Sequence, residues 1–132
     1  MQYILDTNIC IYSFKGLYGL PERIKKAGFD EFAISEITLA ELIYGAHKSQ
    51  NVQRNMDVVH EFAQGITVLP ILGAFDIYGR EKARLKSIGR PIGDFDLLIG
   101  ATAIANGLTV ITRNVREFQR LEGLKWENWV DD

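Results

Sequence analysis

The sequence predicts an α/β domain with a short, mainly parallel central sheet and helices on both of its faces. Three observations support this class. Short apolar and β-branched runs alternate with longer segments of helical periodicity, Pro and Gly stand at the ends of several segments, and 132 residues give room for one domain rather than two. Strands that alternate with helices in this way pair in parallel, and strands this short favour a compact sheet.

The first half of the chain predicts three short strands and four helices. The first apolar run stops at Asp6, and Thr7 or Asn8 is suited to cap the helix that follows. Apolar residues then recur at i, i+3, i+4 and i+7 from Leu39, which gives a helix one apolar face. The predicted strands are 2–5, 32–34 and 66–69, and the predicted helices are 7–14, 21–27, 39–46 and 51–63.

The second half predicts three helices and one further strand. The segment 95–105 is apolar nearly all round, as expected of a helix buried in the core, and Gly107 is suited to end it. A β-branched run begins at Thr109 and ends at Thr112. The predicted helices are 74–88, 95–105 and 115–121, and the predicted strand is 109–112.

Composition and charge limit the function. A net charge of −2, from 15 basic and 17 acidic residues, argues against general electrostatic attraction to nucleic acid. Basic residues are concentrated in 80–90 and 113–120, which are either solvated helix faces or local contacts for phosphate. Cys10, the one cysteine, is expected to be a small buried side chain in a reducing compartment. With no signal peptide and no apolar run of about 20 residues, we expect a soluble, cytoplasmic protein without membrane contact.

Polar groups follow two of the predicted strands, at the place where α/β sheets carry their functional groups. The first strand runs into Asp6, and the strand 109–112 runs into Arg113-Asn114. If these strands are parallel and adjacent, carboxylates after the strands and near the helix N-termini are expected to converge at one edge of the sheet. The acidic residues in such places are Asp6, Glu41, Asp94 and Asp96.

Each of these carboxylates also has a purely structural interpretation. Asp6 is suited to cap the first helix, and Thr38-Leu-Ala-Glu41 has the pattern of a capping box. Asp94 is suited to an N-cap and Asp96 to the first turn of its helix. Taken together, however, three carboxylates in one small site repel each other unless they are protonated or neutralised by a cation. All-oxygen ligands suit Mg²⁺ or Mn²⁺, and neither histidine lies in a zinc motif.

Four blocks of the sequence, in this order and spacing, resemble PIN domains of the VapC toxin family. The resemblance extends over essentially the whole chain and implies a single PIN domain over residues 1–132, with a parallel sheet between helices. It also implies a ribonuclease that depends on Mg²⁺ or Mn²⁺. The blocks are Ile4-Leu-Asp-Thr-Asn8, Leu39-Ala-Glu-Leu-Ile-Tyr-Gly45, Ile92-Gly-Asp-Phe-Asp-Leu-Leu-Ile99 and Val110-Ile-Thr-Arg-Asn-Val-Arg-Glu-Phe118.

The resemblance implies roles for individual residues. Asp6, Glu41 and Asp96 match the three acidic metal ligands of the family. The fourth acidic position of the family falls at Asn114, so either this amide orients a water or Glu117, one turn on, supplies the charge. Whether one or two ions are needed stays open. Accessory roles are expected for Asn8, Asp94 and Thr112, the last to orient water or substrate, and contacts with RNA for Arg80, Arg84, Lys86 and Arg113.

The resemblance also implies partners. We expect a homodimer that inhibits translation and is neutralised by a cognate VapB-type antitoxin, with tRNA, in particular the anticodon loop of the initiator tRNA, as the leading substrate. Two other functions stay open: a non-catalytic PIN-like binding module, and a haloacid-dehalogenase-like phosphatase with Asp6 as its nucleophile. The first helix has an apolar surface that is either a groove for the antitoxin or part of the core, formed by Ile9, Ile11, Tyr12 and Phe14.

Overall fold

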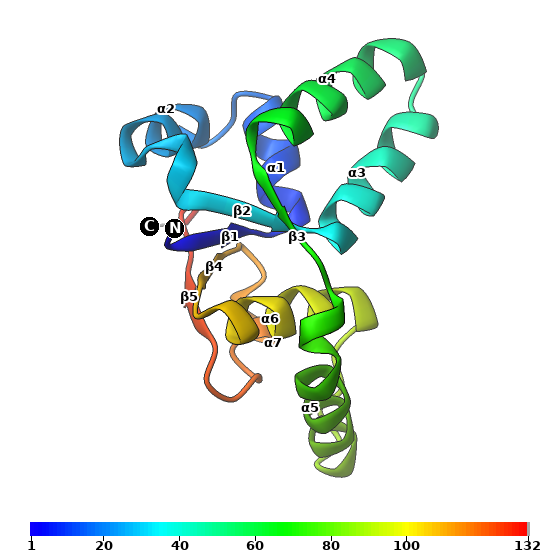
Figure 1. Ribbon diagram of the computed structural model, residues 1–132, viewed down its shortest axis with the longest axis vertical. Helices are drawn as coiled ribbons and strands as arrows, with labels where there is room; N and C mark the ends of the chain where they lie inside the picture. The colour runs from blue at the N-terminus through cyan, green and yellow to red at the C-terminus, as the bar shows by residue number, and fades with distance from the viewer. Residues whose placement is uncertain (132) are drawn as a thin grey trace.

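Five parallel strands form the central sheet of this computed structural model, which describes residues 1–131 (Figure 1). The strands are β1 (Tyr3–Leu5), β2 (Phe32–Ser35), β3 (Thr67–Leu69), β4 (Thr109–Ile111) and β5 (Lys125–Glu127). Their order in the sheet is β3-β2-β1-β4-β5, so β1 lies at the centre and pairs with both β2 and β4. The predicted α/β class with a short parallel sheet is confirmed.

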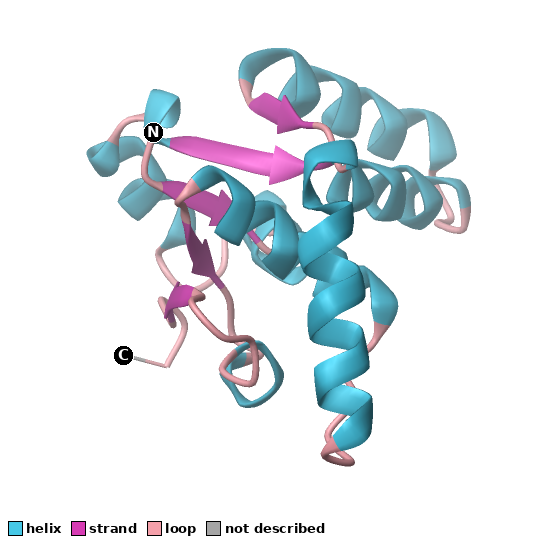
Figure 2. Ribbon diagram, turned by 60° about the horizontal axis from the view of Figure 1, so that its bottom comes forward, coloured by secondary structure: helices cyan, strands magenta, loops and turns pink. Residues whose placement is uncertain are grey.

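Helices cover both faces of the sheet, as predicted (Figures 1 and 2). One layer contains α1 (Thr7–Phe14), α2 (Leu20–Ala27), α3 (Glu36–His47) and α4 (Val52–Gly65). The other contains α5 (Phe75–Ser87), α6 (Asp94–Asn106) and α7 (Val115–Phe118). Two short 3-10 helices, η1 (Phe29–Glu31) and η2 (Leu72–Ala74), join the elements, and α5 projects beyond the sheet. No helix within residues 1–131 is long and apolar enough to cross a membrane.

Alternate residues of each strand enter opposite cores, because successive side chains of a strand point to opposite faces. Leu5 belongs to the core beneath α1–α4, whereas Ile4 belongs to the core beneath α5–α7. Cys10 is fully buried in the first of these cores, as predicted. Burial raises the pKa of the Cys10 thiol, so the side chain stays neutral and behaves as a small apolar group.

The structure decides between the caps considered for the first helix and corrects the start of α3. Asp6 is the N-cap of α1, as one of the two interpretations predicted, because its carboxylate accepts the Thr7 N–H at 2.7 Å; Thr7 and Asn8 are not caps. Ser35, the last residue of β2, caps α3 by accepting the Ile37 N–H at 3.0 Å. The predicted capping box that ends at Glu41 is therefore wrong. The carboxylate of Glu41 lies in the second turn of α3, away from the helix start.

The second half also departs from the prediction. Gly93 precedes α6 and Asp94 is the first residue of that helix, so Asp94 is not an N-cap. α7 ends at Phe118, three residues earlier than predicted, and β5 was not predicted at all. α6 is the buried helix that its apolar sequence indicates. A Cβ at Gly100 would overlap the side chain of Leu121, so the glycine allows this close packing.

Candidate active site

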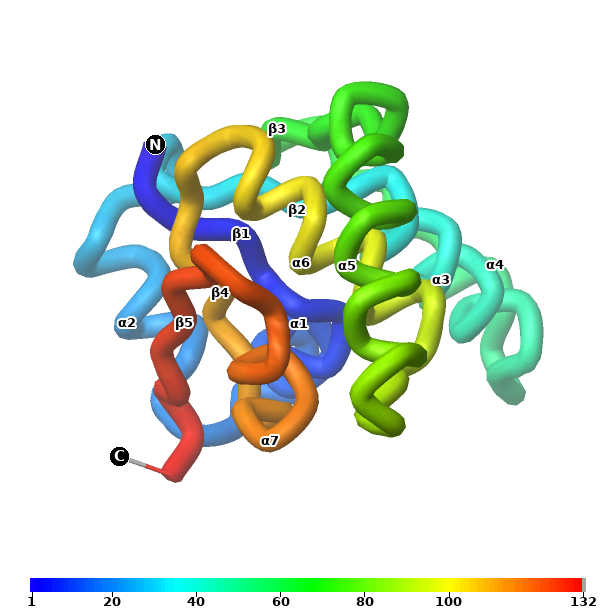
Figure 3. Tube along the Cα trace, turned by 90° about the horizontal axis from the view of Figure 1, so that it is seen from below, coloured from blue at the N-terminus to red at the C-terminus, as the bar shows by residue number. Residues whose placement is uncertain are grey.

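The candidate site lies at the carboxyl ends of β1 and β4, where the direction of strand addition reverses. β2 and β3 follow on one side of β1, and β4 and β5 lie on the other. Such a switch point leaves a crevice outside the sheet, because the connections on its two sides leave in opposite directions. β1 leads into α1 near the middle of the molecule (Figure 3). Asp6 and Thr112 follow β1 and β4 directly, so both stand at this crevice.

Asp6 is held from two sides and is only 4% exposed. One carboxylate oxygen accepts the Thr7 N–H at 2.7 Å, and the other accepts the Thr112 hydroxyl at 2.8 Å. Burial nevertheless raises the pKa of Asp6, and the charges of Glu41 and Glu117 act in the same direction. The fold therefore fixes a carboxylate where its charge is not compensated by any cation of the chain among these partners.

Glu41 is tied to α1 by a hydroxyl. The Thr7 hydroxyl donates to Glu41 Oε1 at 2.7 Å and lies 3.0 Å from the Thr38 hydroxyl, with which it shares a second hydrogen bond. Thr7 was predicted only as a possible helix cap, and nothing in the local pattern indicated this link. The contact brings α3 to the end of β1, so it places Glu41 beside Asp6.

Asp96 reaches the same crevice from the first turn of α6. Burial raises its pKa from 3.8 to about 6, and the charges of Asp6, Glu117 and Glu41 add to this rise. The amide nitrogen of Asn114 donates to Asp96 at 3.3 Å and partly offsets it. The predicted carboxylates Asp6, Glu41 and Asp96 thus lie near enough to repel each other, and Glu117 lies near them.

The loop after β4 connects these acids through Thr112 and Asn114. The Thr112 hydroxyl is fully buried, donates to Asp6 and accepts the Asn114 N–H at 2.8 Å. Its one proton is used in the first of these bonds, so Thr112 positions Asp6 instead of facing a substrate, which differs from the orienting role expected for it. Asn114 does face the acids, through its side-chain amide.

The acids form an open set of ligands rather than a closed cage. Within residues 1–131, no three acidic, histidine or cysteine side chains are close enough together to hold one ion directly. Asp6, Glu41 and Asp96 are each held by a hydroxyl or an amide of the chain. Mg²⁺ usually takes only one or two carboxylates and keeps several of its waters. An open, all-oxygen site with uncompensated negative charge fits such an ion.

Asp94 lies outside this group although it is close in sequence. Its carboxylate accepts the Tyr78 hydroxyl at 2.8 Å and the Lys82 ammonium at 2.9 Å, and these bonds lower its pKa. The side chain therefore connects α6 to α5, away from Asp96. Asn8 is exposed in the first turn of α1.

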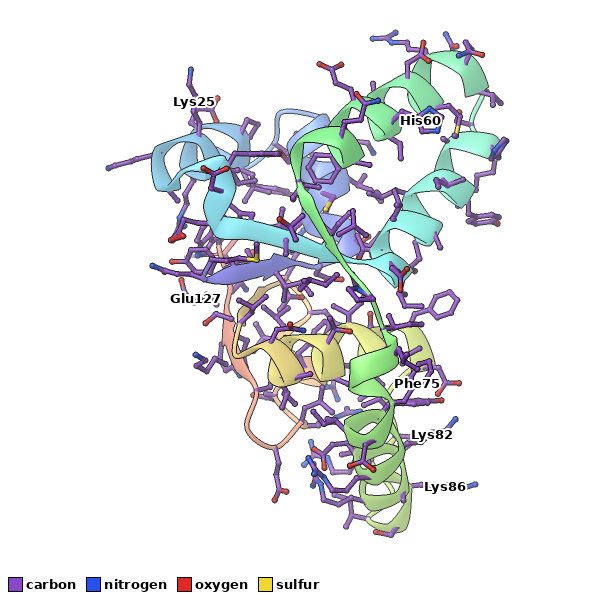
Figure 4. The ribbon with its side chains drawn as sticks, viewed as in Figure 1. Lys25, His60, Phe75, Lys82, Lys86 and Glu127 are labelled. Carbon is purple, nitrogen blue, oxygen red and sulfur yellow. The ribbon has the colours of Figure 1, made fainter. Side chains whose placement is uncertain are left out.

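The basic stretch on α5 divides into two kinds of residue. Arg80 and Lys86 are exposed, and Lys86 projects from the same side of α5 as Lys82 (Figure 4). Arg84 instead donates to buried Glu81 at 2.8 and 2.9 Å and to the Arg120 carbonyl at 2.7 Å. These bonds engage Nε and Nη2 and give Arg84 a structural role, while the RNA contact expected of this partly exposed side chain stays a prediction.

Arg113 is exposed in the loop after β4 and lies against the ring of Tyr18. Tyr18 could not be recognised from the sequence as a neighbour of Arg113, because the two residues lie 95 positions apart.

The apolar surface of α1 is partly core and partly groove. Ile9 is fully buried and Tyr12 is packed against the core, so these two do not line an open surface. A groove of about 460 Å³ lies between α1, α3 and α4 and extends to Glu41. Its apolar lining includes Ile11, Phe14, Leu42, Ala46, Val58 and Val59.

Comparisons with known proteins agree with this architecture. The family model described as "PIN domain" matches residues 3–124. The tRNA(fMet)-specific endonuclease VapC of Shigella flexneri is 40% identical over 130 residues, which cover 98% of each protein. Ribonuclease VapC2 of Haemophilus influenzae is 41% identical over 98% of this chain and 99% of its own length. Among solved structures, DNA-bound VapBC from Salmonella typhimurium contains a chain with a TM-score of 0.91 and 39% identity, covering 98% of both chains.

Proposed function

The chain belongs to the PIN-domain family, and we propose on this basis that it is a metal-dependent endoribonuclease toxin that cuts tRNA and is blocked by a VapB-type antitoxin. The observation that carries the proposal is the approach of Asp6, Glu41 and Asp96 to one another at the switch point of the sheet. Relatives named as ribonucleases or endonucleases are about 40% identical over nearly their whole length, which supports the same reaction class here.

In this proposal Asp6, Glu41 and Asp96 would hold Mg²⁺ or Mn²⁺, one or two of them directly and the rest through waters of the ion. When bound, such an ion supplies an activated water and compensates the negative charge that develops on the phosphate. The chain supplies the geometry: Thr112 fixes Asp6, Thr7 fixes Glu41, and the Asn114 amide orients Asp96 or the attacking water. Exposed Arg80, Lys86 and Arg113 attract the RNA backbone.

A phosphatase with Asp6 as nucleophile fits the geometry less well, since both oxygens of Asp6 accept hydrogen bonds from Thr7 and Thr112. A non-catalytic binding module would have no need for carboxylates kept close to each other at a cost in stability. The repulsion at the site therefore favours the nuclease over both alternatives.

We also propose that the groove between α1, α3 and α4 receives an apolar segment of the antitoxin. Ile11 and Phe14 line this groove, and Glu41 lies at its end, so a bound segment would reach the site that it blocks. The solved VapBC relatives are complexes of this toxin type with its partner, which supports an antitoxin here. A homodimer and a location in the bacterial cytoplasm, where tRNA is present, complete the proposal.

The test is cleavage of purified tRNA by wild type, Asp96→Asn and Asp57→Asn in Mg²⁺ or Mn²⁺. Asp57→Asn is the matched control, because it makes the same chemical change at an exposed position of α4. We expect discrete fragments with 5′-phosphate and 3′-hydroxyl ends from the wild type and the control. EDTA should abolish them, and Asp96→Asn should lower the rate by about 10³-fold, the value of several kcal/mol of charge stabilisation. Fragments with 2′,3′-cyclic phosphate ends, or no cleavage of any RNA, would contradict the proposal.

A further inference from the structure

We propose that Tyr18, together with Arg113 beside it, forms a stacking site for an unpaired nucleobase of the RNA, adjacent to the acidic site. The inference rests on the proposed ribonuclease function and adds to it a subsite that recognises a base rather than a phosphate. Four features of the structure carry it: an exposed ring, a supporting aromatic neighbour, a cation at the ring and an unusual backbone.

The ring of Tyr18 is presented to solvent but is held in place. Tyr18 is 48% exposed, although large aromatic side chains are normally covered. The ring of Tyr12 meets it edge-on, with centroids 5.2 Å apart and planes at 77°. A perpendicular neighbour holds the ring in place, and about half of the Tyr18 side chain stays open to solvent. Tyr18 therefore offers a fixed aromatic surface.

Arg113 lies at the hydroxyl end of this ring. Its Nη1 donates to the Tyr18 hydroxyl at 3.3 Å, whereas its Cζ is 5.5 Å from the ring centroid. The guanidinium therefore lies over part of the ring, toward its hydroxyl. Arg113 also interacts with the Tyr12 side chain and lies 3.6 Å from Asp131, so three partners set its position. A base on the ring would have a cation at its edge, which is suited to an adjacent RNA phosphate.

The backbone at Tyr18 is in the left-handed region, with φ 58°. This conformation is uncommon for a residue with a bulky side chain and costs of order 1–2 kcal/mol. Gly16 and Gly19 adopt positive φ on either side of it, at 69° and 65°. Glycine would be the unstrained choice at position 18 as well, so the tyrosine is kept at a cost in stability. Backbone strain of this kind is concentrated at functional sites.

The ring is connected directly to the acidic site through the loop after β4. Arg113 stands between Thr112, which donates to Asp6, and Asn114, which donates to Asp96. The loop that positions the carboxylates therefore also positions the cation at the ring. Sequence-tolerant and loop-specific RNA contacts commonly use a base stacked on an aromatic side chain with arginine beside it. A nucleotide close to the scissile bond is thus the expected occupant.

The experiment measures binding to an anticodon stem-loop RNA that carries the fluorescent base 2-aminopurine at single loop positions. All proteins carry Asp96→Asn so that the RNA is not cut. Tyr18→Ala should weaken binding by about tenfold, the value of one stacked base, and should abolish the fluorescence quenching at one loop position. Tyr18→Phe should lose less, because it keeps the ring. Phe29→Ala is the matched control, since Phe29 is 39% exposed but precedes β2 at the opposite end of the sheet.

Two further measurements separate stacking from other effects. Tyr18→Asn removes the ring but tolerates the left-handed backbone, so it should bind as weakly as Tyr18→Ala while the protein melts at no lower temperature than Tyr18→Ala. The affinity of Tyr18→Ala should depend on salt concentration with the same slope as that of the parent protein, which keeps Tyr18, because no phosphate contact is lost. If Tyr18→Ala binds the RNA as tightly as the parent protein does, the stacking site alone is overturned. Failure of the parent protein to bind any RNA would overturn the proposed function with it.

Discussion

Two buried carboxylates, Glu81 and Asp6, have opposite surroundings in this molecule. Glu81 on α5 is 1% exposed and accepts two hydrogen bonds from the Arg84 guanidinium and one from the Glu122 N–H at 2.7 Å. These contacts lower the pKa of Glu81. Asp6 is 4% exposed, but its charged neighbours are other acids, and its pKa is raised. Hydrogen bonds from a cation lower the pKa of Glu81, whereas burial, with other acids nearby, raises the pKa of Asp6.

The difference separates a structural carboxylate from a functional one. Glu81 has its cation built into the chain one helical turn away, and the group ties α5 to the segment after α7 through the Arg120 carbonyl. At the sheet edge the chain supplies hydroxyls and an amide, which fix the carboxylates without neutralising them. A site left with uncompensated charge is where an ion from solution binds most favourably.

The largest effect on stability is expected from Glu81→Ala. The substitution leaves the Arg84 guanidinium and the Glu122 N–H without their acceptor, which costs about 2–3 kcal/mol for a pair whose cation is partly exposed. Urea unfolding measures the change. Glu61→Ala, at an exposed position of α4, is the control and should change the free energy of unfolding by less than about 0.5 kcal/mol. If Glu81→Ala and Glu61→Ala change the free energy of unfolding by similar amounts, Glu81 is not the structural carboxylate described above.

Asp96→Asn should stabilise the metal-free protein, whereas Glu81→Ala destabilises it. Because the fold disfavours the ionised form of Asp96, the neutral amide should raise the free energy of unfolding at pH 7 by about 1 kcal/mol, allowing for the solvent that reaches this half-buried side chain. The measurement is urea unfolding in EDTA. Saturating Mn²⁺ should stabilise the wild type more than the variant. Destabilisation of the metal-free variant would show that the carboxylate is structural.

The pH dependence of stability should separate the two regions. Asp96 has a folded pKa of about 6 against 3.8 unfolded, so its favourable contribution is complete below about pH 4 and is lost as the pH rises to about 6. Glu81 has a folded pKa below 4.5, so its contribution is present above that value and is lost as the pH falls through the folded pKa. Unfolding of wild type, Asp96→Asn and Glu81→Gln in EDTA from pH 3 to 7 tests both signs. If the free energy of unfolding depends on pH in the same way in all three proteins, the directions given for the two pKa shifts are wrong.

The smallest effects are expected at the fourth acidic position. Glu117 acts on the pKa of both Asp6 and Asp96, so Glu117→Gln should weaken Mn²⁺ binding by about two- to fivefold, the value of one partly screened charge. Asn114→Asp adds a charge at the same site and should strengthen Mn²⁺ binding. Calorimetric titration with Mn²⁺ in the absence of RNA measures both. No change with Glu117→Gln would leave Asn114 as the residue that fills this position.

Apolar runs, helical periodicity and the Pro, Gly and capping residues at segment ends were sufficient to predict four strands and the seven α-helices found within residues 1–131. β5 was missed since its three residues are exposed and are held in the sheet by backbone pairing, which leaves no pattern in the side chains. The convergence of the acids was predicted from the meeting of parallel strand ends. The bond between Arg84 and buried Glu81 was not predicted, because a run of basic residues does not reveal the partners of its members. Tyr18 and Arg113 meet only in the fold.

The central position of β1 has a consequence for the nascent chain. The Asp6 carboxylate accepts a hydrogen bond from Thr112, which lies 106 positions later in the chain. The Asp6 N–H also donates to the carbonyl of Ile111. A ribosome that adds about 5–20 residues each second needs about 5–20 s to cover that interval. During this time the first strand has no neighbour on its β4 side and the acids are scattered along an unfinished chain. An assembled nuclease therefore cannot exist until synthesis has passed Thr112, which leaves an interval in which an antitoxin made beforehand can be waiting.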